Sequence, residues 1–461
     1  MPKKICFLSL VSLLALTFSF AQSKQDKKLV KSIDELVTSR LNRISPGCAI
    51  LISKNGQILY RKAFGTANLE LNVPAKPDMI FRIGSITKQF TAVSILQLVE
   101  QGRISLNDSI QKYIKDFPPK GQTITIENLL TQTSGIPDYL NLELNLPNPF
   151  RIDISTKQIV DSIKKQPLIF TPSSKFEYSN SNYFLLGYII EQVSGLSYAE
   201  YLKKNIFDPI GLTNTYYDTP AKIISNRANG YEKTDTSYSN ADFISMSTFY
   251  SAGALMSNTE DLNKWNNALY DGKILKKETL EKAHQSFKLS DGKMSEYGYG
   301  WFIRNIDGSK TIEHGGNIFG FRAEEIFLPN ENIFVTGLFN CRQSNNDEQE
   351  LCYDIVKLML GKPLIKEIPL PDEILNRYVG TYKNDQYNQS MTIQKGGDGR
   401  LYCTLSNGTG TNMVLFAQNE TLFLLPEVKR IRTTLQFVVE NGKATKIIWS
   451  QENTGEFKRI D

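Results

Sequence analysis

Histidine is scarce in this chain of 461 residues, which contains only His284 and His314. Two imidazoles cannot supply a multi-histidine metal site, and we expect neither a metal nor another cofactor. The chain also lacks any block of lysine and arginine interleaved with aromatic residues, and its formal net charge is only +5. Nucleic acid is therefore not an expected partner.

Cysteine is also infrequent, with five residues in the chain. Cys6 lies in an N-terminal apolar run, which leaves Cys48, Cys341, Cys352 and Cys403. Four cysteines allow three complete pairings, and the sequence does not choose among them. Cys48 and Cys341 lie in or at the end of apolar, strand-like segments, so buried free thiols fit the pattern at least as well as a disulfide. Their spacing matches no zinc signature.

A Gly-Xaa-Ser-Xaa-Gly nucleophile elbow is absent from the sequence, which argues against the α/β-hydrolase arrangement. A Ser-His-Asp triad would have to use one of the two histidines. The residues around His284 are typical of a solvated helix, and we predict no function for this side chain. His314 is followed by two glycines, as expected at a strand edge where the backbone closely approaches a ligand.

The first 21 residues have the pattern of a secretory signal peptide. Lys3 and Lys4 form the charged start, residues 5–20 form the apolar run, and Ala21 ends a small-residue cleavage site. The alternative, an uncleaved membrane anchor, is disfavoured because the run is shorter than the roughly 20 apolar residues that span a bilayer. We therefore expect export to a bacterial periplasm or the extracellular space, with no transmembrane span after the signal is removed.

The most informative segment is Phe81–Phe90, in which Ser85 precedes Lys88 by three residues at the start of an apolar helix. Residues at i and i+3 share one face of a helix, so the Lys88 amine can approach the Ser85 hydroxyl. A neutral lysine there can accept the serine proton. The N-terminus of the helix also offers backbone N–H groups to a developing oxyanion. Taken alone, the motif is equally consistent with Ser85 as a helix cap.

Two further elements strengthen the interpretation of Ser85 as a nucleophile. Tyr178-Ser179-Asn180 is predicted to lie on a loop immediately before a helix, and His314-Gly315-Gly316 lies between two strand-like segments. Penicillin-interacting enzymes combine the same three parts: a serine with a lysine, a Ser-Asp-Asn-type element, and a Lys-Thr-Gly-type strand.

With these motifs, the chain resembles the serine β-lactamase-like and penicillin-binding-protein-like hydrolases. That family includes class C β-lactamases, D-alanyl-D-alanine carboxypeptidases, D-amino-acid peptidases and esterases. Further segments agree with it in the same order, namely residues 129–138, 186–191, 208–212 and 251–257. The resemblance covers roughly residues 31 to 362.

The resemblance implies an α+β fold, in which an antiparallel sheet is flanked by helices and accompanied by a second, helical lobe. We expect a hydrolase domain over residues 22–362 and a proline-bearing linker over 363–373. Residues 374–461 follow, and their short alternating runs predict a small β-barrel domain that resembles lipocalin-like domains. The six runs predicted as strands are residues 390–394, 401–405, 413–418, 421–425, 435–440 and 445–449. We interpret this domain as structural, or as a cap over the cleft.

The resemblance also implies acyl transfer through a covalent intermediate on Ser85. Lys88 and Tyr178 would share the transfer of protons, and the sequence does not decide which of them is the base. The backbone N–H groups of Ser85 and Asn317 would form the oxyanion hole. Asn180, His314, Gly315, Gly316 and Arg322 are the expected substrate-binding residues, for a small-molecule or peptide substrate of possible cell-wall origin.

Several positions depart from the family pattern. His314 replaces the usual lysine and is expected to be largely neutral above neutrality, which predicts weak anchoring of a substrate carboxylate and poor β-lactam hydrolysis. Gln132 and Ser173 replace a histidine and a glycine of flanking segments. The expected activity is therefore cleavage of amides or esters, as by a D-amino-acid peptidase, carboxypeptidase or esterase. The alternatives are a weak class C-like β-lactamase and a non-hydrolytic penicillin-binding sensor. The oligomeric state stays open.

Overall fold

The computed structural model describes residues 24–44, 46–141, 150–234, 237–342, 347–364, 367–386, 388–406, 413–425, 433–450 and 454–461. The predicted signal peptide, residues 1–21, lies outside these ranges. Within them, no helix combines the length and the apolar character that crossing a membrane requires.

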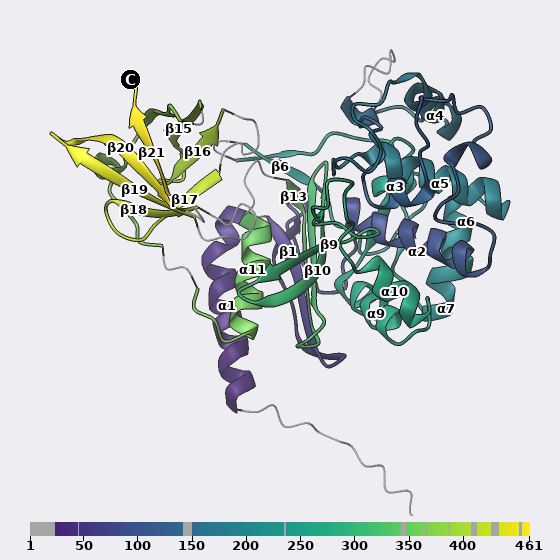
Figure 1. The fold of residues 1–461 in the computed structure, drawn as a ribbon. Helices are drawn as coiled ribbons and strands as arrows, with labels where there is room; N and C mark the ends of the chain where they lie inside the picture. The colour runs from purple at the N-terminus through teal and green to yellow at the C-terminus, as the bar shows by residue number, and fades with distance from the viewer. Residues whose placement is uncertain are drawn as a thin grey trace, which may run out of the picture.

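The chain folds into a hydrolase-like α+β unit followed by a β-barrel (Figure 1). The helices are α1 (Lys24–Ile44), α2 (Thr87–Glu100), α3 (Ile126–Leu130), α4 (Thr156–Lys165), α5 (Asn180–Ser194), α6 (Tyr198–Leu202), α7 (Asp208–Ile210), α8 (Tyr250–Gly253), α9 (Thr259–Tyr270), α10 (Lys277–Ala283), α11 (Asp347–Met359) and α12 (Asp372–Leu375), with 3-10 turns η1 (Gly84–Ile86), η2 (Ile110–Lys112) and η3 (Tyr139–Asn141) and a π-turn η4 (Lys203–Phe207).

The strands of the first unit are β1 (Gly47–Lys54), β2 (Gln57–Asn68), β3 (Val73–Pro74), β4 (Phe81–Arg82), β5 (Tyr216–Tyr217), β6 (Tyr231–Lys233), β7 (Tyr238–Asn240), β8 (Leu255–Ser257), β9 (Phe302–Ile306), β10 (Ser309–Ile318), β11 (Phe321–Leu328), β12 (Ile333–Phe339) and β13 (Cys341–Arg342). The main sheet has the order β3-β2-β1-β12-β11-β10-β9. β1 and β2 form an N-terminal hairpin, which turns through Asn55 and Gly56 in left-handed conformations. N-terminal and C-terminal segments of the unit thus form a single sheet.

Helices cover both faces of this sheet (Figure 1). On one face α1 and α11 lie side by side, and Arg40 of α1 forms an ion pair with Asp354 of α11. The sequence analysis did not predict α1. Its buried residues Ile33, Leu36 and Val37 follow the i, i+3, i+4 spacing of an amphipathic helix. Packing on the sheet therefore stabilises a helix whose remaining surface is polar.

The opposite face carries the helical lobe that includes α2, α5 and α9. Helix α2 is buried almost all round, from Thr87 to Leu96 without interruption, as expected for a helix in the centre of a core. Helix α6 runs directly into the π-turn η4 and continues as α7. The burial of α2 holds its N-terminal residues in one place.

The C-terminal unit is a closed barrel of strands β14 (Gly380–Asn384), β15 (Gln389–Lys395), β16 (Leu401–Leu405), β17 (Met413–Ala417), β18 (Leu422–Leu425), β19 (Thr433–Glu440), β20 (Lys443–Ser450) and β21 (Thr454–Arg459). Six of these strands were predicted. β14 and β21 were missed, and their pairing closes the barrel. Apolar side chains such as Tyr382, Met391 and Phe437 fill the interior. The predicted α+β fold with an additional small barrel is confirmed.

The four cysteines of the described residues are free thiols, and all are buried. Cys48 and Cys352 lie in the core between the sheet and its α1–α11 layer, whereas Cys403 lies inside the barrel. Burial raises the pKa of the Cys48 thiol to about 12. The thiols therefore behave as small apolar side chains.

Candidate active site

Ser85 lies in η1, directly before α2, where the chain passes under strand β10. Gly84 adopts a positive φ of 50°, and a Cβ there would lie only 3.0 Å from the backbone nitrogen of Asn317. The Ser85 backbone and the Asn317 N–H are therefore close neighbours. This is the arrangement that an oxyanion hole made from these two amides requires.

Lys88 lies behind Ser85 with no exposed surface. Its Nζ atom is 3.0 Å from Ser85 Oγ, 2.8 Å from Asn180 Oδ1 and 2.8 Å from the carbonyl oxygen of Ala252. Burial lowers the pKa of Lys88 to about 7, against the opposing effect of the Asp138 carboxylate. The predicted approach of lysine to serine is thus present in the structure.

The hydrogen bonds around Lys88 direct its lone pair. Asn180 donates through Nδ2 to Asp138 Oδ2 at 2.7 Å, so its Oδ1 atom is available only as an acceptor. The Ala252 carbonyl is likewise an obligate acceptor. A neutral amine has two hydrogens, which satisfy these two acceptors and leave the lone pair directed at the Ser85 hydroxyl. The sequence analysis did not assign Asp138 or Ala252 a role, although both lie in segments that match the family.

Tyr178 lies on the other side of Ser85, immediately before α5. Its hydroxyl hydrogen-bonds Ser85, and its ring centroid is 4.8 Å from Lys88 Nζ. Burial raises the pKa of Tyr178 well above its usual value. Gln132 supports this segment, because its Oε1 atom accepts hydrogen bonds from the Ser179 N–H and from Asn182 Nδ2. Tyr178 is therefore a neutral phenol in the resting site.

His314 is buried on β10 and neutral. Its Nδ1 atom donates to the Gly315 carbonyl at 2.6 Å, so Nε2 is left to accept from the Tyr297 hydroxyl at 3.1 Å. Burial and the nearby Lys88 lower the pKa of His314 to about 3. The surroundings of His314 are therefore consistent with the expectation that its side chain carries little positive charge.

A pocket of about 360 Å³ opens over these residues. It is lined by Ser85, Tyr178, Phe302, Arg304, Glu313, His314, Gly315, Gly316, Asn317, Arg322, Glu324 and Gln349. The structure thus brings together all nine predicted site residues, with Lys88 and Asn180 hydrogen-bonded behind the pocket wall. A Cβ on Gly316 would lie 1.9 Å from the Ile83 carbonyl oxygen, so only glycine allows β10 to approach this turn.

The sequence analysis missed the charged residues and one glutamine at the far side of this pocket. Glu313 and Glu324 come from β10 and β11, Arg304 comes from β9, and Gln349 comes from α11. Their sequence signal is weak, because alternating charged residues in strands usually face water. The side chain of Arg322 is only 12% exposed, so it is part of the pocket wall and not a surface arginine.

The prediction of a solvated position for His284 is wrong. His284 follows α10 and is 5% exposed. Its Nδ1 atom lies 3.1 Å from the Tyr270 hydroxyl, and its ring stands edge-on against Trp301. Burial lowers the pKa of His284 to about 3. The helix ends here and turns into the core, which the local sequence did not indicate.

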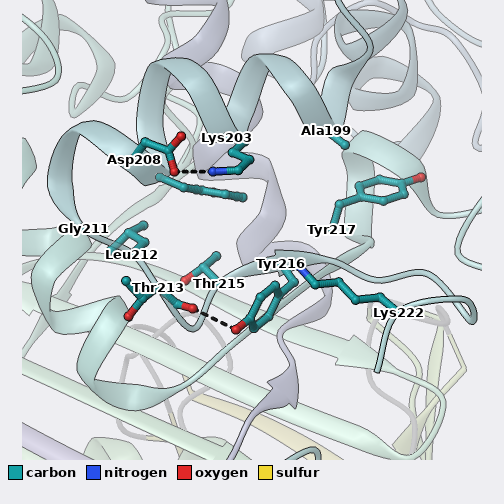
Figure 2. Close-up of a pocket in the computed structure, with 11 residues that line it drawn as sticks. Ala199, Lys203, Asp208, Gly211, Leu212, Thr213, Thr215, Tyr216, Tyr217 and Lys222 are labelled. Carbon is teal, nitrogen blue, oxygen red and sulfur yellow. Dashed lines mark hydrogen bonds and ion pairs between the residues drawn. The ribbon is translucent and has the colours of Figure 1, made fainter. Parts of the chain in front are cut away.

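A second hollow of about 480 Å³ lies at the α6–α7 end of the helical lobe (Figure 2). Its polar groups are largely engaged with one another. Lys203 forms an ion pair with Asp208, and the Tyr216 hydroxyl donates to the Thr213 carbonyl. The pocket beside Ser85 remains the candidate active site, because Ser85 lines it and Lys88, whose pKa is lowered, lies directly behind Ser85.

Comparison with known families identifies the family of this chain. Residues 33–358 match the family model described as Beta-lactamase, and residues 365–461 match a domain of unknown function, DUF3471. The chain therefore belongs to the Beta-lactamase family, with DUF3471 forming its C-terminal barrel.

Several relatives are similar over most of the chain. Penicillin-binding protein 4* of Bacillus subtilis is 27% identical over 435 residues, which cover 88% of this chain and 93% of that protein. Protein flp of Staphylococcus aureus is 30% identical over 319 residues, which cover 67% of this chain and 63% of that protein.

Solved structures share the fold. An octameric penicillin-binding protein homologue from Pyrococcus abyssi aligns with a TM-score of 0.67 and 28% identity, covering 94% of this chain and 99% of the other. D-amino acid amidase from Ochrobactrum anthropi SV3 aligns with a TM-score of 0.64 over 72% of this chain and 99% of the other. At 23% identity, the latter similarity is one of fold.

Proposed function

We propose that this protein is an exported serine hydrolase that cleaves amide or ester bonds through an acyl-enzyme on Ser85. The observation that carries the proposal is the position of Lys88, whose buried Nζ atom lies 3.0 Å from Ser85 Oγ. Its pKa, lowered by burial to about 7, lets a large fraction of the lysine act as a neutral base near neutrality.

In the acylation step, Lys88 Nζ accepts the hydroxyl proton while Ser85 Oγ bonds to the substrate carbonyl carbon. The negative charge moves to the carbonyl oxygen, where the N–H groups of Ser85 and Asn317 stabilise it; one such donor contributes roughly 3 kcal/mol in other enzymes. Collapse of this intermediate re-forms the carbonyl and breaks the bond to the leaving amine or alcohol. A water molecule then hydrolyses the ester through the same steps.

The two candidate bases differ in their surroundings. Burial disfavours the ammonium form of Lys88 and the phenolate form of Tyr178, so near neutrality a large fraction of the lysine and nearly all of the phenol are neutral. A neutral amine is a base, whereas a neutral phenol is a hydrogen-bond donor. We therefore assign the first proton transfer to Lys88 and protonation of the leaving group to Tyr178, which then regains a proton from the Lys88 ammonium, so that both groups are neutral again before deacylation.

The neutral state of His314 favours substrates that do not depend on a fixed cation to hold a carboxylate. We accordingly place peptides, simple amides and esters ahead of β-lactams, with weak β-lactam hydrolysis as the alternative. The similarity to proteins described as penicillin-binding also keeps a second candidate, a sensor that is acylated once and not released. Export rests on the signal-like residues 1–21.

The experiment compares the mature protein with Ser85→Ala on a p-nitrophenyl ester, a D-Ala-D-Ala peptide and a chromogenic cephalosporin. Product release and intact mass are followed together. Ser94→Ala is the matched control, because Ser94 is a buried serine of α2 whose hydroxyl bonds only the Phe90 carbonyl. We expect turnover that requires Ser85 and tolerates Ser94→Ala.

The outcomes separate the candidates. A mass increase on Ser85 that persists without turnover identifies the sensor, whereas cephalosporin cleavage at rates typical of good enzymes overturns the substrate assignment. Equal activity of the wild type and Ser85→Ala overturns the proposed mechanism.

A further inference from the structure

A buried glutamate faces the substrate pocket from the strand next to β10. In the antiparallel pairing of β10 with β11, Glu324 stands directly opposite Gly315. Because Gly315 has no side chain, both carboxylate oxygens of Glu324 lie 2.9 Å from the position that a Cβ at Gly315 would occupy. Glu324 is only 3% exposed, and it lines the same pocket as Ser85. Substrate over the Gly315 face therefore meets this carboxyl group.

The charges around the pocket leave Glu324 in a negative environment. Arg304 is shared by two carboxylates, with Glu296 at 3.2 Å and Glu313 at 3.2 Å. Glu313 also accepts a hydrogen bond from Tyr353 at 2.9 Å. Arg322 Nε is 4.0 Å from Glu324 Oε1, beyond hydrogen-bonding distance. Glu348 also raises the pKa of Glu324 by its charge, so four carboxyl groups meet two guanidinium groups in this part of the structure.

We propose that Glu324 determines specificity by binding an ammonium group of the substrate over Gly315, so that cationic substrates are preferred there to carboxylates. That the bound ammonium group belongs to a substrate rests on the proposed hydrolase function. Charge-assisted hydrogen bonds from an ammonium group would satisfy the ionised carboxylate of Glu324, whereas a substrate carboxylate would disfavour that ionised form by like charge.

Burial also raises the pKa of Glu324 to about 8. In the empty pocket this group is therefore mainly protonated near neutrality, and a bound cation favours its ionised form. Binding of an ammonium ligand should release a proton and strengthen as pH rises toward 8. A residue with a purely structural role would show no such dependence on the charge of the ligand.

The first test measures binding without catalysis. n-Butylammonium and butyrate have the same chain length, and their dissociation constants for Ser85→Ala are obtained by ligand-observed NMR. We expect the cation to bind about tenfold more tightly than the anion, which is the ratio for one charge-assisted hydrogen bond. Ser85→Ala combined with Glu324→Gln should bring the two constants within about threefold.

Glu325→Gln in the Ser85→Ala background is the matched control. Glu325 is the next residue of β11, is equally buried at 3% exposure, and also has a pKa raised by burial to about 8. It hydrogen-bonds Gln89 and is not among the residues lining the pocket. We expect it to preserve the preference. Equal or tighter binding of butyrate, or a preference that survives Glu324→Gln, overturns the proposal.

A kinetic test assigns the ammonium group to one side of the scissile bond. Acetylated D-dipeptides carry lysine or glutamate at the first or second position, with D-alanine at the other. We expect lysine to raise kcat/KM about tenfold over glutamate at one position, and Glu324→Gln to abolish the difference. If no peptide is cleaved, the proposed peptidase activity fails while the binding test still decides the role of Glu324.

Discussion

Lys88 is the residue on which the proposed chemistry depends, because it has an ionisable amine and no contact with solvent. Its three polar contacts come from different parts of the chain: Ser85 from η1, Asn180 from α5, and Ala252 from α8. A free lysine has a pKa of about 10.4 and would be almost fully protonated at neutral pH. Burial lowers the pKa of Lys88, so the same motif in an exposed helix would lack a base.

The first prediction concerns the pH dependence of turnover. Because only the neutral amine can accept the Ser85 proton, kcat/KM for a neutral ester should rise with pH through about 7 and then level off. Below that point it should fall by about tenfold per pH unit. A pH–rate profile of the wild type tests this. Lys88→Met should reduce turnover by about 10²- to 10⁴-fold, and a Lys88→Met enzyme of full activity would exclude lysine as the base.

The second prediction concerns Asp138, whose charge raises the pKa of Lys88 against the effect of burial. Asp138→Asn removes that charge while an amide oxygen can still accept from Asn180. The acidic limb of the pH–rate profile should therefore move below pH 7. Asp116→Asn is the control, because Asp116 pairs with Lys164 and its side chain is 71% exposed. An unmoved limb in Asp138→Asn would mean that this carboxylate does not act on Lys88.

Among the secondary-structure elements, the contact between β10 and η1 places the proposed oxyanion amides together. Gly316 lies against the Ile83 carbonyl, and Gly84 lies against the Asn317 nitrogen. This close approach of two backbone segments requires glycine on both sides. The catalytic geometry is therefore set by main-chain packing as much as by side chains.

The third prediction follows from this contact. Gly316→Ala would place a methyl group 1.9 Å from the Ile83 oxygen, so β10 must move away from η1. We expect unfolding in denaturant to show a loss of about 1–3 kcal/mol, together with slower acylation of Ser85. Gly397→Ala is the control, because no atom lies within 4 Å of its added Cβ. Normal acylation by Gly316→Ala would show that this spacing is not needed.

For the whole molecule, a buried ion pair joins the barrel to the Beta-lactamase unit. Arg400 of the barrel lies 3.4 Å from Asp347 at the start of α11 and also bonds Glu367 after the first unit. The side chains of Arg400 and Asp347 are 6% and 8% exposed. Asp347 is two residues from Gln349, which lines the active-site pocket. The barrel therefore contacts the helix that forms the far wall of that pocket.

The fourth prediction tests this connection. Arg400→Met removes a buried cation from beside two carboxylates and should destabilise the protein by about 3 kcal/mol. Because the lost contact links the two units, unfolding monitored in denaturant should separate into two transitions. Lys395→Met is the control, because Lys395 pairs with Asp372, whose side chain is 69% exposed, and should change little. A single, unshifted transition in Arg400→Met would contradict this interpretation.

The sequence by itself determined the features that depend on local spacing. The Ser85–Lys88 pair, the strands around His314-Gly315-Gly316 and six barrel strands follow from residue types and their periodicity. They were predictable because neighbours at i+2 or i+3 share a face whatever the rest of the chain does. The family motifs then indicated the order of these parts.

Tertiary structure alone decided the features that depend on burial. The lowered pKa of Lys88, the neutral state of His314 and the position of Glu324 in the pocket arise where distant segments exclude water. The buried position of His284 was missed for the same reason, because its local sequence is that of an exposed helix end. Local patterns specify which groups are present, whereas packing between segments sets their ionisation and their access to a substrate.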